Sequence, residues 1–139
     1  MKKITIDLNV ILDFLNKRNK HIQAAKIIEL CNENQIQGYI CAHEITTLAY
    51  FLMKNHNNSN KVKFVLNEFL DMFKIIPITE TILRKALNSK INDYEDAVID
   101  ISSQENKIDF IVTRNLDDFK KSSLKSVSPS EFLTLYKKM

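Results

Sequence analysis

The feature that most constrains the fold is a short apolar strand, rich in β-branched residues, that passes directly into a helical pattern. Residues 4–6 are Ile-Thr-Ile, and Asp7, Leu8 and Asn9 follow before the apolar residues take up helical spacing. Such runs are typical of strands buried on both faces of a parallel sheet. Ligand sites in open α/β sheets lie beyond the carboxyl ends of the strands. Asp7 is therefore predicted at the ligand-binding edge, although capping of the next helix by Asp7 or Asn9 explains the same pattern.

Similar apolar runs occur at residues 39–41, 75–78 and 108–113, separated by segments in which apolar residues recur at helical spacing. Pro77 cannot donate to a strand ladder, so the run that contains it is predicted near an edge of the sheet. Residues 125–127 are compatible with a short additional edge strand. Strands that alternate with helices favour a parallel sheet. We therefore predict an α/β fold with three α/β/α layers around a central parallel sheet of four to five strands.

Length and composition limit the classes of function. The chain is predicted to form one domain, residues 1–139, and its formal net charge of +3 is compatible with nucleic-acid binding. No apolar run reaches the ~20 residues of a membrane span, and the N-terminus lacks the pattern of a signal peptide, so we expect a cytoplasmic protein with no membrane partner. Cys31 and Cys41 lack the spacing of a disulfide framework or a metal site. The only glycine, Gly38, excludes the Gly-rich phosphate loops of P-loop and dinucleotide-binding proteins.

Acidic and amide side chains lie near the ends of the predicted strands. Asp7 and Asn9 follow the first strand, and Glu44 lies in the first turn of the helix after the second, where the helix dipole alone would also favour a carboxylate. Asp93 and Asp96 begin the helix that precedes the fourth strand. Asp93 also suits the N-cap position of that helix, whereas Asp96 has no comparable structural explanation.

The fourth strand ends in a further polar group, which consists of Thr113, Arg114, Asn115, Asp117 and Asp118. Because the carboxyl ends of parallel strands meet at one edge of a sheet, three or four carboxylates are predicted to gather in one pocket. Two carboxylates ~4 Å apart repel by about 4 kcal/mol at an effective dielectric constant of ~20, so such a cluster needs shared protons or a bound cation. Carboxylate and amide oxygens suit Mg²⁺ or Mn²⁺ rather than zinc. A common task of acid-bound Mg²⁺ is phosphodiester hydrolysis.

These segments resemble the PIN-domain ribonucleases, which include the VapC-type toxins of bacterial toxin–antitoxin pairs. Residues 7–13, Asp-Leu-Asn-Val-Ile-Leu-Asp, are similar to the family's opening Asp-Thr-Asn-Val-Leu-Leu-Asp. Residues 93–97, Asp-Tyr-Glu-Asp-Ala, are similar to its Asp-Phe-Glu-Asp-Ala, and Glu44 matches its second acid. The family's closing segments are resembled by residues 112–115, 118–119 and 128–133.

The resemblance implies a Mg²⁺- or Mn²⁺-dependent endoribonuclease, with Asp7 and Asp96 as the principal metal ligands and Glu44 in support. Asn115 stands where many members have Asp, so Asp118 is expected to act as the fourth acid, with Asn115 or Asp117 as the alternative. Leu8 departs from the family, which usually has a small hydroxyl residue there. The expected supporting residues are Asn9, Asp93, Thr113, Arg114 and Asn115.

The resemblance also implies partners and leaves alternatives open. Family members are commonly homodimers that a small antitoxin protein neutralises, and RNA is the implied substrate. The apolar faces near residues 45–53 and 61–73 suit such contacts, as does ordinary core packing. One alternative is a catalytically degenerate PIN domain that binds RNA or a protein without cutting. A phosphatase of the haloacid dehalogenase type would need a second Asp where this chain has Asn9.

Overall fold

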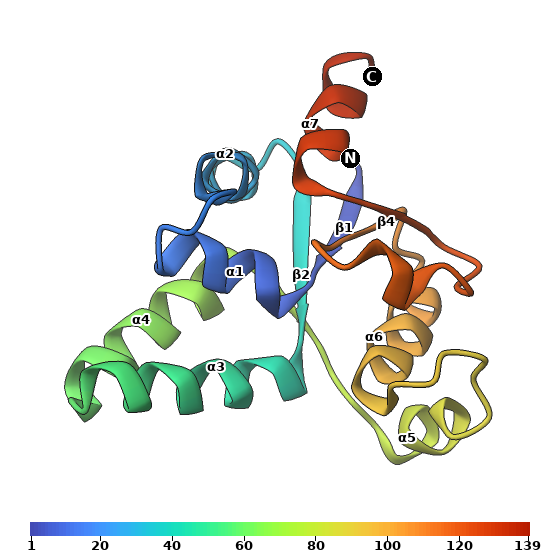
Figure 1. The fold of residues 1–139 in the computed structure, drawn as a ribbon, viewed down its shortest axis with the longest axis horizontal. Coiled ribbons are helices and arrows are strands. Elements are labelled where there is room, and N and C mark those ends of the chain that lie inside the picture. Colours follow the sequence, from blue (N-terminus) through green and yellow to red (C-terminus); the bar gives the residue numbers. More distant parts are fainter.

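The computed structural model describes residues 1–139 and is built on a five-stranded, all-parallel sheet (Figure 1). The strands, in the spatial order β3-β2-β1-β4-β5, are β3 (Lys74–Ile76), β2 (Gln37–Cys41), β1 (Lys3–Ile6), β4 (Phe110–Val112) and β5 (Lys125–Val127). At the centre, Ile4 lies opposite Gly38 of β2 and Phe110 of β4. The predicted α/β fold and parallel sheet are confirmed, and β3 and β5 are the edge strands.

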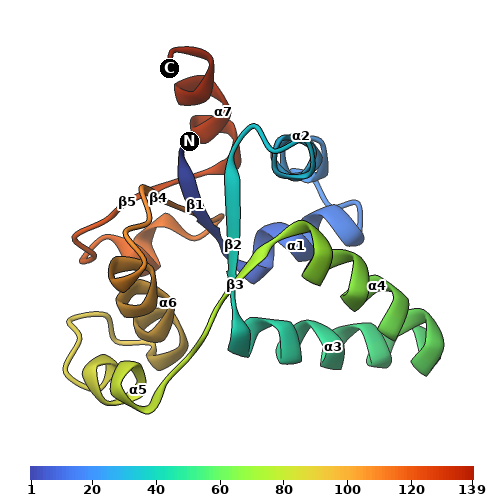
Figure 2. The same ribbon diagram turned by 180° about the vertical axis from the view of Figure 1, so that it is seen from behind.

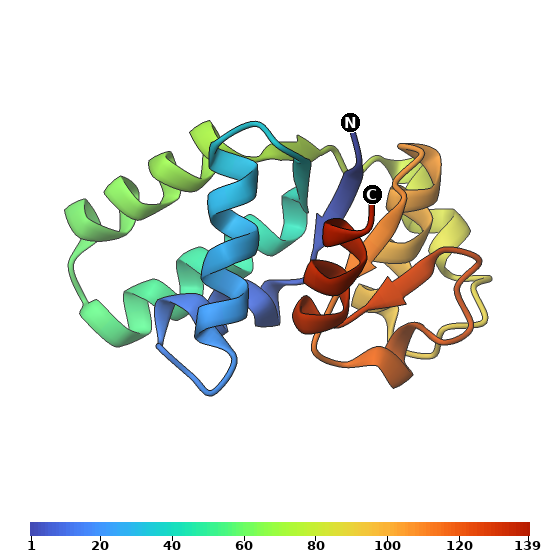
Figure 3. The ribbon, with the colours of Figure 1, turned by 90° about the horizontal axis from the view of Figure 1, so that it is seen from above.

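Seven α-helices and one 3₁₀ helix cover the two faces of the sheet. They are α1 (Leu8–Leu15), α2 (His21–Asn32), α3 (Ala42–His56), α4 (Ser59–Met72), α5 (Glu80–Ala86), α6 (Tyr94–Glu105), η1 (Leu116–Phe119) and α7 (Pro129–Lys137). Figure 2, which shows the molecule from behind, places α1 to α4 on one side of the sheet and α5 and α6 on the other. Viewed from above, α3 and α4 form a hairpin that extends away from the sheet, and the two chain termini lie near each other (Figure 3).

Successive residues of the central strands pack into two separate apolar cores, as expected for strands buried on both faces. Ile40 packs with residues of α1, α2, α3, α4 and α7, whereas its neighbours Tyr39 and Cys41 pack with residues of α5, α6 and η1. Ile111 and Val112 divide between the two cores in the same way. The three-layer arrangement follows directly from this alternation.

Side-chain caps fix the starts of several helices. The Thr79 hydroxyl accepts a hydrogen bond from the Ile82 N–H at 3.2 Å, and Ser128 forms a full capping box with Glu131 at the start of α7. The connection between α3 and α4 is short, because α3 continues to His56 and α4 begins at Ser59. Asn57 takes a left-handed backbone conformation and Asn58 caps α4, so two residues connect these helices.

The third and fourth expected strands are longer than the observed ones, whereas β1 and β2 begin earlier than the apolar runs at residues 4–6 and 39–41. The third strand ends at Ile76, directly before Pro77, instead of reaching residue 78, and β4 covers only three residues of the expected run from 108 to 113. The Thr113 N–H nevertheless donates to the Val127 carbonyl oxygen at 2.9 Å, so the chain keeps its strand direction beyond β4. None of the helices combines the length and the apolar character that crossing a bilayer requires.

Candidate active site

Asp7 leaves β1 at the centre of the sheet and is only 6% exposed. Its backbone N–H donates to the Val112 carbonyl oxygen at 3.0 Å, and its Oδ2 accepts a hydrogen bond from the Thr113 hydroxyl at 2.8 Å. Asp7 occupies the N-cap position of α1, but its side chain makes no capping bond, and Asn9 lies within the helix. The capping interpretation is therefore wrong, and the carboxylate faces the ends of β1 and β4.

Glu44 reaches the same place from the first turn of α3. Its Oε2 accepts a hydrogen bond from the Leu8 N–H at 2.9 Å, whereas its buried Oε1 has no hydrogen-bond partner. Burial raises the pKa of Glu44 well above its ordinary value, and the negative charge of Asp7 raises it further. A buried carboxylate oxygen without a partner is costly unless a proton or a cation satisfies it.

Burial also raises the pKa of Asp7, although the hydrogen bond from Thr113 partly offsets this effect. The two carboxyl groups lie close enough to influence each other, because the negative charge of Asp7 raises the pKa of Glu44. Without a cation, burial therefore favours the protonated, uncharged form of both carboxyl groups.

Asp96 lies in the first turn of α6 and is half-buried. Burial raises its pKa to about 7, and the negative charges of Asp93, Asp7 and Asp118 contribute to the shift. The Asp96 N–H donates to Asp93 Oδ1 at 3.1 Å, so Asp93 is the N-cap of α6, as one of the two interpretations predicted. The structure thus brings Asp7 and Asp96 from distant parts of the chain within electrostatic reach of each other.

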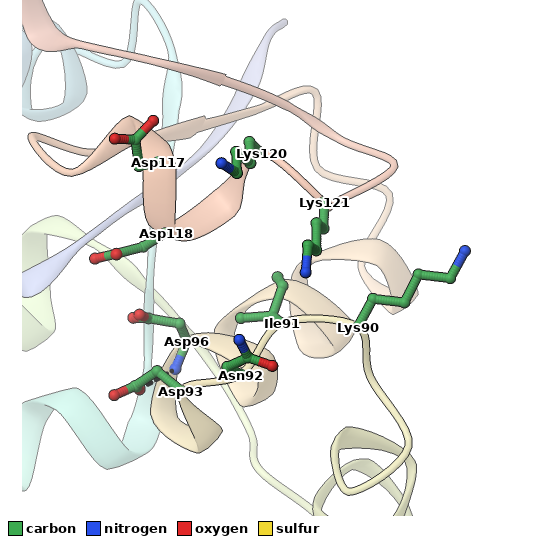
Figure 4. A pocket seen from close by; sticks show the side chains of 9 residues that line it. All are labelled: Lys90, Ile91, Asn92, Asp93, Asp96, Asp117, Asp118, Lys120 and Lys121. Atoms are coloured by element: carbon green, nitrogen blue, oxygen red, sulfur yellow. Dashed lines mark hydrogen bonds between the residues drawn. The ribbon is translucent and has the colours of Figure 1, made fainter.

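Asp118 approaches the same group from η1. Its negative charge raises the pKa of both Asp7 and Asp96, whereas Asp117 is not among the charges that do so. In Figure 4 the Asp118 side chain lies on the same side as the Asp96 side chain, whereas the Asp117 carboxylate points away from Asp96. These observations favour Asp118 over Asp117 as the fourth acid.

A hollow of about 370 Å³ opens beside these acids, between the start of α6 and η1 (Figure 4). Asp93, Asp96 and Asp118 are among its lining residues. No three His, Cys, Asp or Glu side chains lie close enough together to form a ready-made metal site. The donor set nevertheless fits a hard cation, because it consists of carboxylate oxygens and includes the unpartnered, buried Glu44 Oε1.

Arg114 and Asn115, predicted as supporting residues, are held in different ways. The Asn115 N–H donates to the Thr113 hydroxyl at 3.0 Å. Arg114 Nη1 donates to Asp13 Oδ1 at 2.7 Å, and Asp13 is 2% exposed. The predicted site did not include Asp13. Asp13 lies among apolar residues of α1, and this pattern indicates a buried carboxylate that needs a cationic partner.

The raised pKa values predict how the stability of the metal-free protein depends on pH. A carboxyl group with a higher pKa in the folded state than in the unfolded state stabilises the fold at low pH, and this contribution is lost as the pH rises through the folded-state pKa. We expect the melting temperature to fall between about pH 5 and about pH 8, and to fall less in Asp96→Asn, because the pKa of Asp96 is about 7. Thermal denaturation of both proteins in chelator measures the difference. An equal decline in both would contradict the role of Asp96.

Comparisons with known proteins identify the family and the fold. The family model for the PIN domain matches residues 3–117, whereas no curated protein is significantly similar in sequence. A toxin–antitoxin complex from Klebsiella pneumoniae matches 91% of this chain and 97% of its own, with 20% identity and a TM-score of 0.67. DNA-bound VapBC from Salmonella typhimurium matches 93% and 99%, with 16% identity and a TM-score of 0.69.

A third solved structure is that of the sarcin-ricin-loop-cleaving toxin VapC20 from Mycobacterium tuberculosis, which matches 78% of this chain and 86% of its own. Its sequence identity is 11% and its TM-score is 0.61. At these sequence identities the similar structures establish only the fold, and membership of a family rests on the match to the family model. Because that model spans most of the chain, from β1 to η1, the protein belongs to the PIN domain family.

Proposed function

We propose that the protein is an endoribonuclease that depends on Mg²⁺ or Mn²⁺ and hydrolyses RNA phosphodiesters as the cytoplasmic toxin of a toxin–antitoxin pair. One observation supports this most strongly: Glu44 buries an unpartnered carboxylate oxygen beside Asp7, and Asp7 lies within electrostatic reach of Asp96 and Asp118. Such an arrangement of carboxylates is costly for the fold and useful for binding a cation.

Asp7, Glu44, Asp96 and Asp118 would hold the ion. A bound Mg²⁺ or Mn²⁺ would lower the pKa of the attacking water and stabilise negative charge on the phosphate oxygens. Thr113 fixes the orientation of Asp7, and the Leu8 N–H fixes that of Glu44, so both acids are positioned in advance. The first of these carboxylates directly follows β1, and the second lies in the first turn of α3.

Partners of two kinds are part of the proposal. Similar solved structures include toxin–antitoxin and VapBC complexes, which supports a small antitoxin protein as one partner. The hairpin of α3 and α4 exposes large side chains, with Tyr50 64% and Phe64 66% exposed, and these support a homodimer or antitoxin contact. Leu48 and Leu52 of the same hairpin are buried and belong to the core.

Cleavage of a mixture of structured RNAs tests the proposal directly. Wild type is expected to cut with Mg²⁺ or Mn²⁺ and to stop in chelator, and Asp96→Asn is expected to lose this activity. Asp118→Asn and Asp117→Asn form a matched pair, because the two acids are neighbours on η1 and both are exposed. We expect Asp117→Asn to keep substantially more activity than Asp118→Asn.

The outcomes separate the proposal from its alternative. Metal-dependent cutting that survives in Asp96→Asn would contradict the assigned site. A wild type that neither cuts RNA nor binds Mn²⁺ in calorimetry would instead favour a degenerate PIN domain that acts as a binding module. Mn²⁺ binding without cutting of any RNA in the mixture would favour a nuclease with a narrow substrate.

A further inference from the structure

A buried ion pair joins the last turn of α1 to the segment that follows β4. Asp13 is 2% exposed, and its Oδ1 accepts a hydrogen bond from Arg114 Nη1 at 2.7 Å. Its neighbours in the helix, Ile11 and Leu12, are buried apolar residues. Removing a carboxylate from water is costly, and replacing a buried ion pair by apolar residues of similar volume is often neutral or stabilising. Stability of the fold therefore does not by itself explain this pair.

The same two segments are joined at a second point, within the candidate active site. The hydroxyl group of Thr113, the residue before Arg114, donates to Asp7 Oδ2 at 2.8 Å. Asp7 is at the N-cap position of α1, and Asp13 lies about 9 Å further along the helix axis, at ~1.5 Å per residue. The short Thr113 side chain thus contacts the start of α1, and the long Arg114 side chain contacts its last turn. Two contacts with different parts of one helix fix both the position and the direction of the segment.

Arg114 is the middle residue of a tight turn that orients the Thr113 hydroxyl group. The Asn115 N–H donates to the Thr113 hydroxyl oxygen at 3.0 Å, so this oxygen acts as an acceptor toward Asn115 and as a donor toward Asp7. The Asn115 carbonyl oxygen accepts a hydrogen bond from the Asp118 N–H at 3.1 Å, within η1. The turn at residues 113–115 therefore determines both the hydroxyl group that holds Asp7 and the start of the 3₁₀ helix that carries Asp118.

We propose that Asp13 is a positioning residue of the candidate active site, which acts by holding Arg114 and, with it, the turn at residues 113–115. Through this turn it keeps the Thr113 hydroxyl group directed at Asp7 and keeps η1 in place. Asp13 neither binds the metal nor touches the substrate in this role. The inference rests on the proposed function, because it assigns the ion pair to the same site. Residues that orient metal ligands typically contribute 10–100-fold to metal affinity or activity.

Arg18 supplies a second positive charge near Asp13 without holding the turn. Its Nη1 lies 3.6 Å from the same Asp13 oxygen, beyond hydrogen-bond distance, whereas the 2.7 Å contact of Arg114 is a charge-assisted hydrogen bond. Because Arg18 remains close by, replacing Arg114 alone still leaves Asp13 with a cationic partner. The position of the turn can therefore be disturbed without leaving an isolated charge in the core.

The double substitution Asp13→Leu/Arg114→Met tests the proposal, because it replaces the pair by apolar side chains and leaves the net charge unchanged. We expect the melting temperature to stay close to that of wild type. We expect kcat for RNA cleavage and the affinity for Mn²⁺ in calorimetry each to fall roughly 10-fold, with KM nearly unchanged. Amide hydrogen exchange reports on the turn without any cleavage, and the Asn115 N–H should lose its protection.

A matched control removes another ion pair between two helices. Lys85 of α5 lies 2.7 Å from Glu105, the last residue of α6, and Lys85→Met/Glu105→Leu also leaves the net charge unchanged. This variant should keep the cleavage rate, the Mn²⁺ affinity and the exchange behaviour of Asn115.

Two single substitutions decide the matter if the double variant folds poorly. In Arg114→Met, the loss of kcat and of Asn115 protection should match that of the double variant, because the turn loses the same contact. In Asp13→Asn, an amide oxygen can still accept the hydrogen bond from Arg114, so most of the cleavage activity and the protection should remain. Lost activity in Asp13→Asn with unchanged Asn115 protection would show that the charge of Asp13 acts in another way, and would overturn the proposal.

The remaining outcomes distinguish this role from the proposed function. Full activity and full Asn115 protection in Asp13→Leu/Arg114→Met, with cleavage by wild type, would refute the role of Asp13 and leave the nuclease standing. A change confined to KM would mean that Arg114 contacts the substrate, and would overturn the positioning role as well. Lost protection of Asn115 in the double variant, with no cleavage by wild type under any metal condition, would refute the nuclease and support the role of Asp13 in holding the turn.

Discussion

Replacing Asp7 by Asn is expected to lower metal-dependent RNA cleavage by roughly 1,000-fold or more, which corresponds to about 4 kcal/mol of transition-state stabilisation. The substitution removes one central carboxylate from the proposed metal site. It should leave the melting temperature unchanged or raise it, because an amide can still accept the Thr113 hydrogen bond and no longer carries a buried negative charge beside Glu44. Cleavage assays and thermal denaturation of the same preparation measure both effects.

Asp100→Asn is the matched comparison for this prediction. Asp100 lies one turn after Asp96 on α6, is 3% exposed, and accepts hydrogen bonds from Gln104 and Ser122. Its role is to hold these two side chains, so the substitution should lower the melting temperature and cost far less activity than Asp7→Asn. Unchanged cleavage by Asp7→Asn would remove Asp7 from the mechanism. Equal inactivity of a well-folded Asp100→Asn would show that the site extends further along α6.

Replacing Gly38 by Ala adds only one methyl group, yet we expect it to lower the stability of the fold substantially. A Cβ atom at Gly38 would lie 2.5 Å from Cys31 Sγ and 2.8 Å from Phe73 Cδ1, and all three residues are buried. The obstacle is space and not backbone conformation, because no glycine of the chain has a positive φ. Overpacking of this kind costs about 1–3 kcal/mol, or roughly 3–10 °C in melting temperature at this chain length.

A double-mutant cycle identifies the source of this loss. Cys31→Ala removes the sulfur atom that a Cβ at Gly38 would meet, so Gly38→Ala/Cys31→Ala should be more stable than the sum of the single effects predicts. Calorimetric melting of the four proteins gives the coupling. A wild-type melting temperature for Gly38→Ala would mean that β2 shifts away from α2 at little cost.

Much of the fold could be predicted because its evidence is local. The run at residues 4–6 is apolar enough for a strand buried on both faces, and the acids that follow the strands had to meet at one edge. The exact strand ends could not be predicted. Thr113, for example, continues the hydrogen bonding of β4 without belonging to the strand.

The roles of individual acids depended on contacts that local sequence does not contain. Asp7 and Asp93 both occupy N-cap positions, yet only Asp93 caps its helix. The difference is Thr113, which lies far along the chain and donates to the Asp7 carboxylate. The pairing of Asp13 with Arg114 is equally distant in sequence and was missed for the same reason.

The position of β1 between β2 and β4 has a consequence for the synthesis of the protein. Asp7 is held by Val112 and Thr113, and Glu44 is held by the backbone of Leu8. A nascent chain whose β4 has not yet left the ribosome therefore contains Asp7 and Glu44. It still lacks the strand and the Thr113 hydroxyl group that orient Asp7. Incomplete translation products cannot form this arrangement of acids. The site is therefore complete only after most of the chain has left the ribosome and folded.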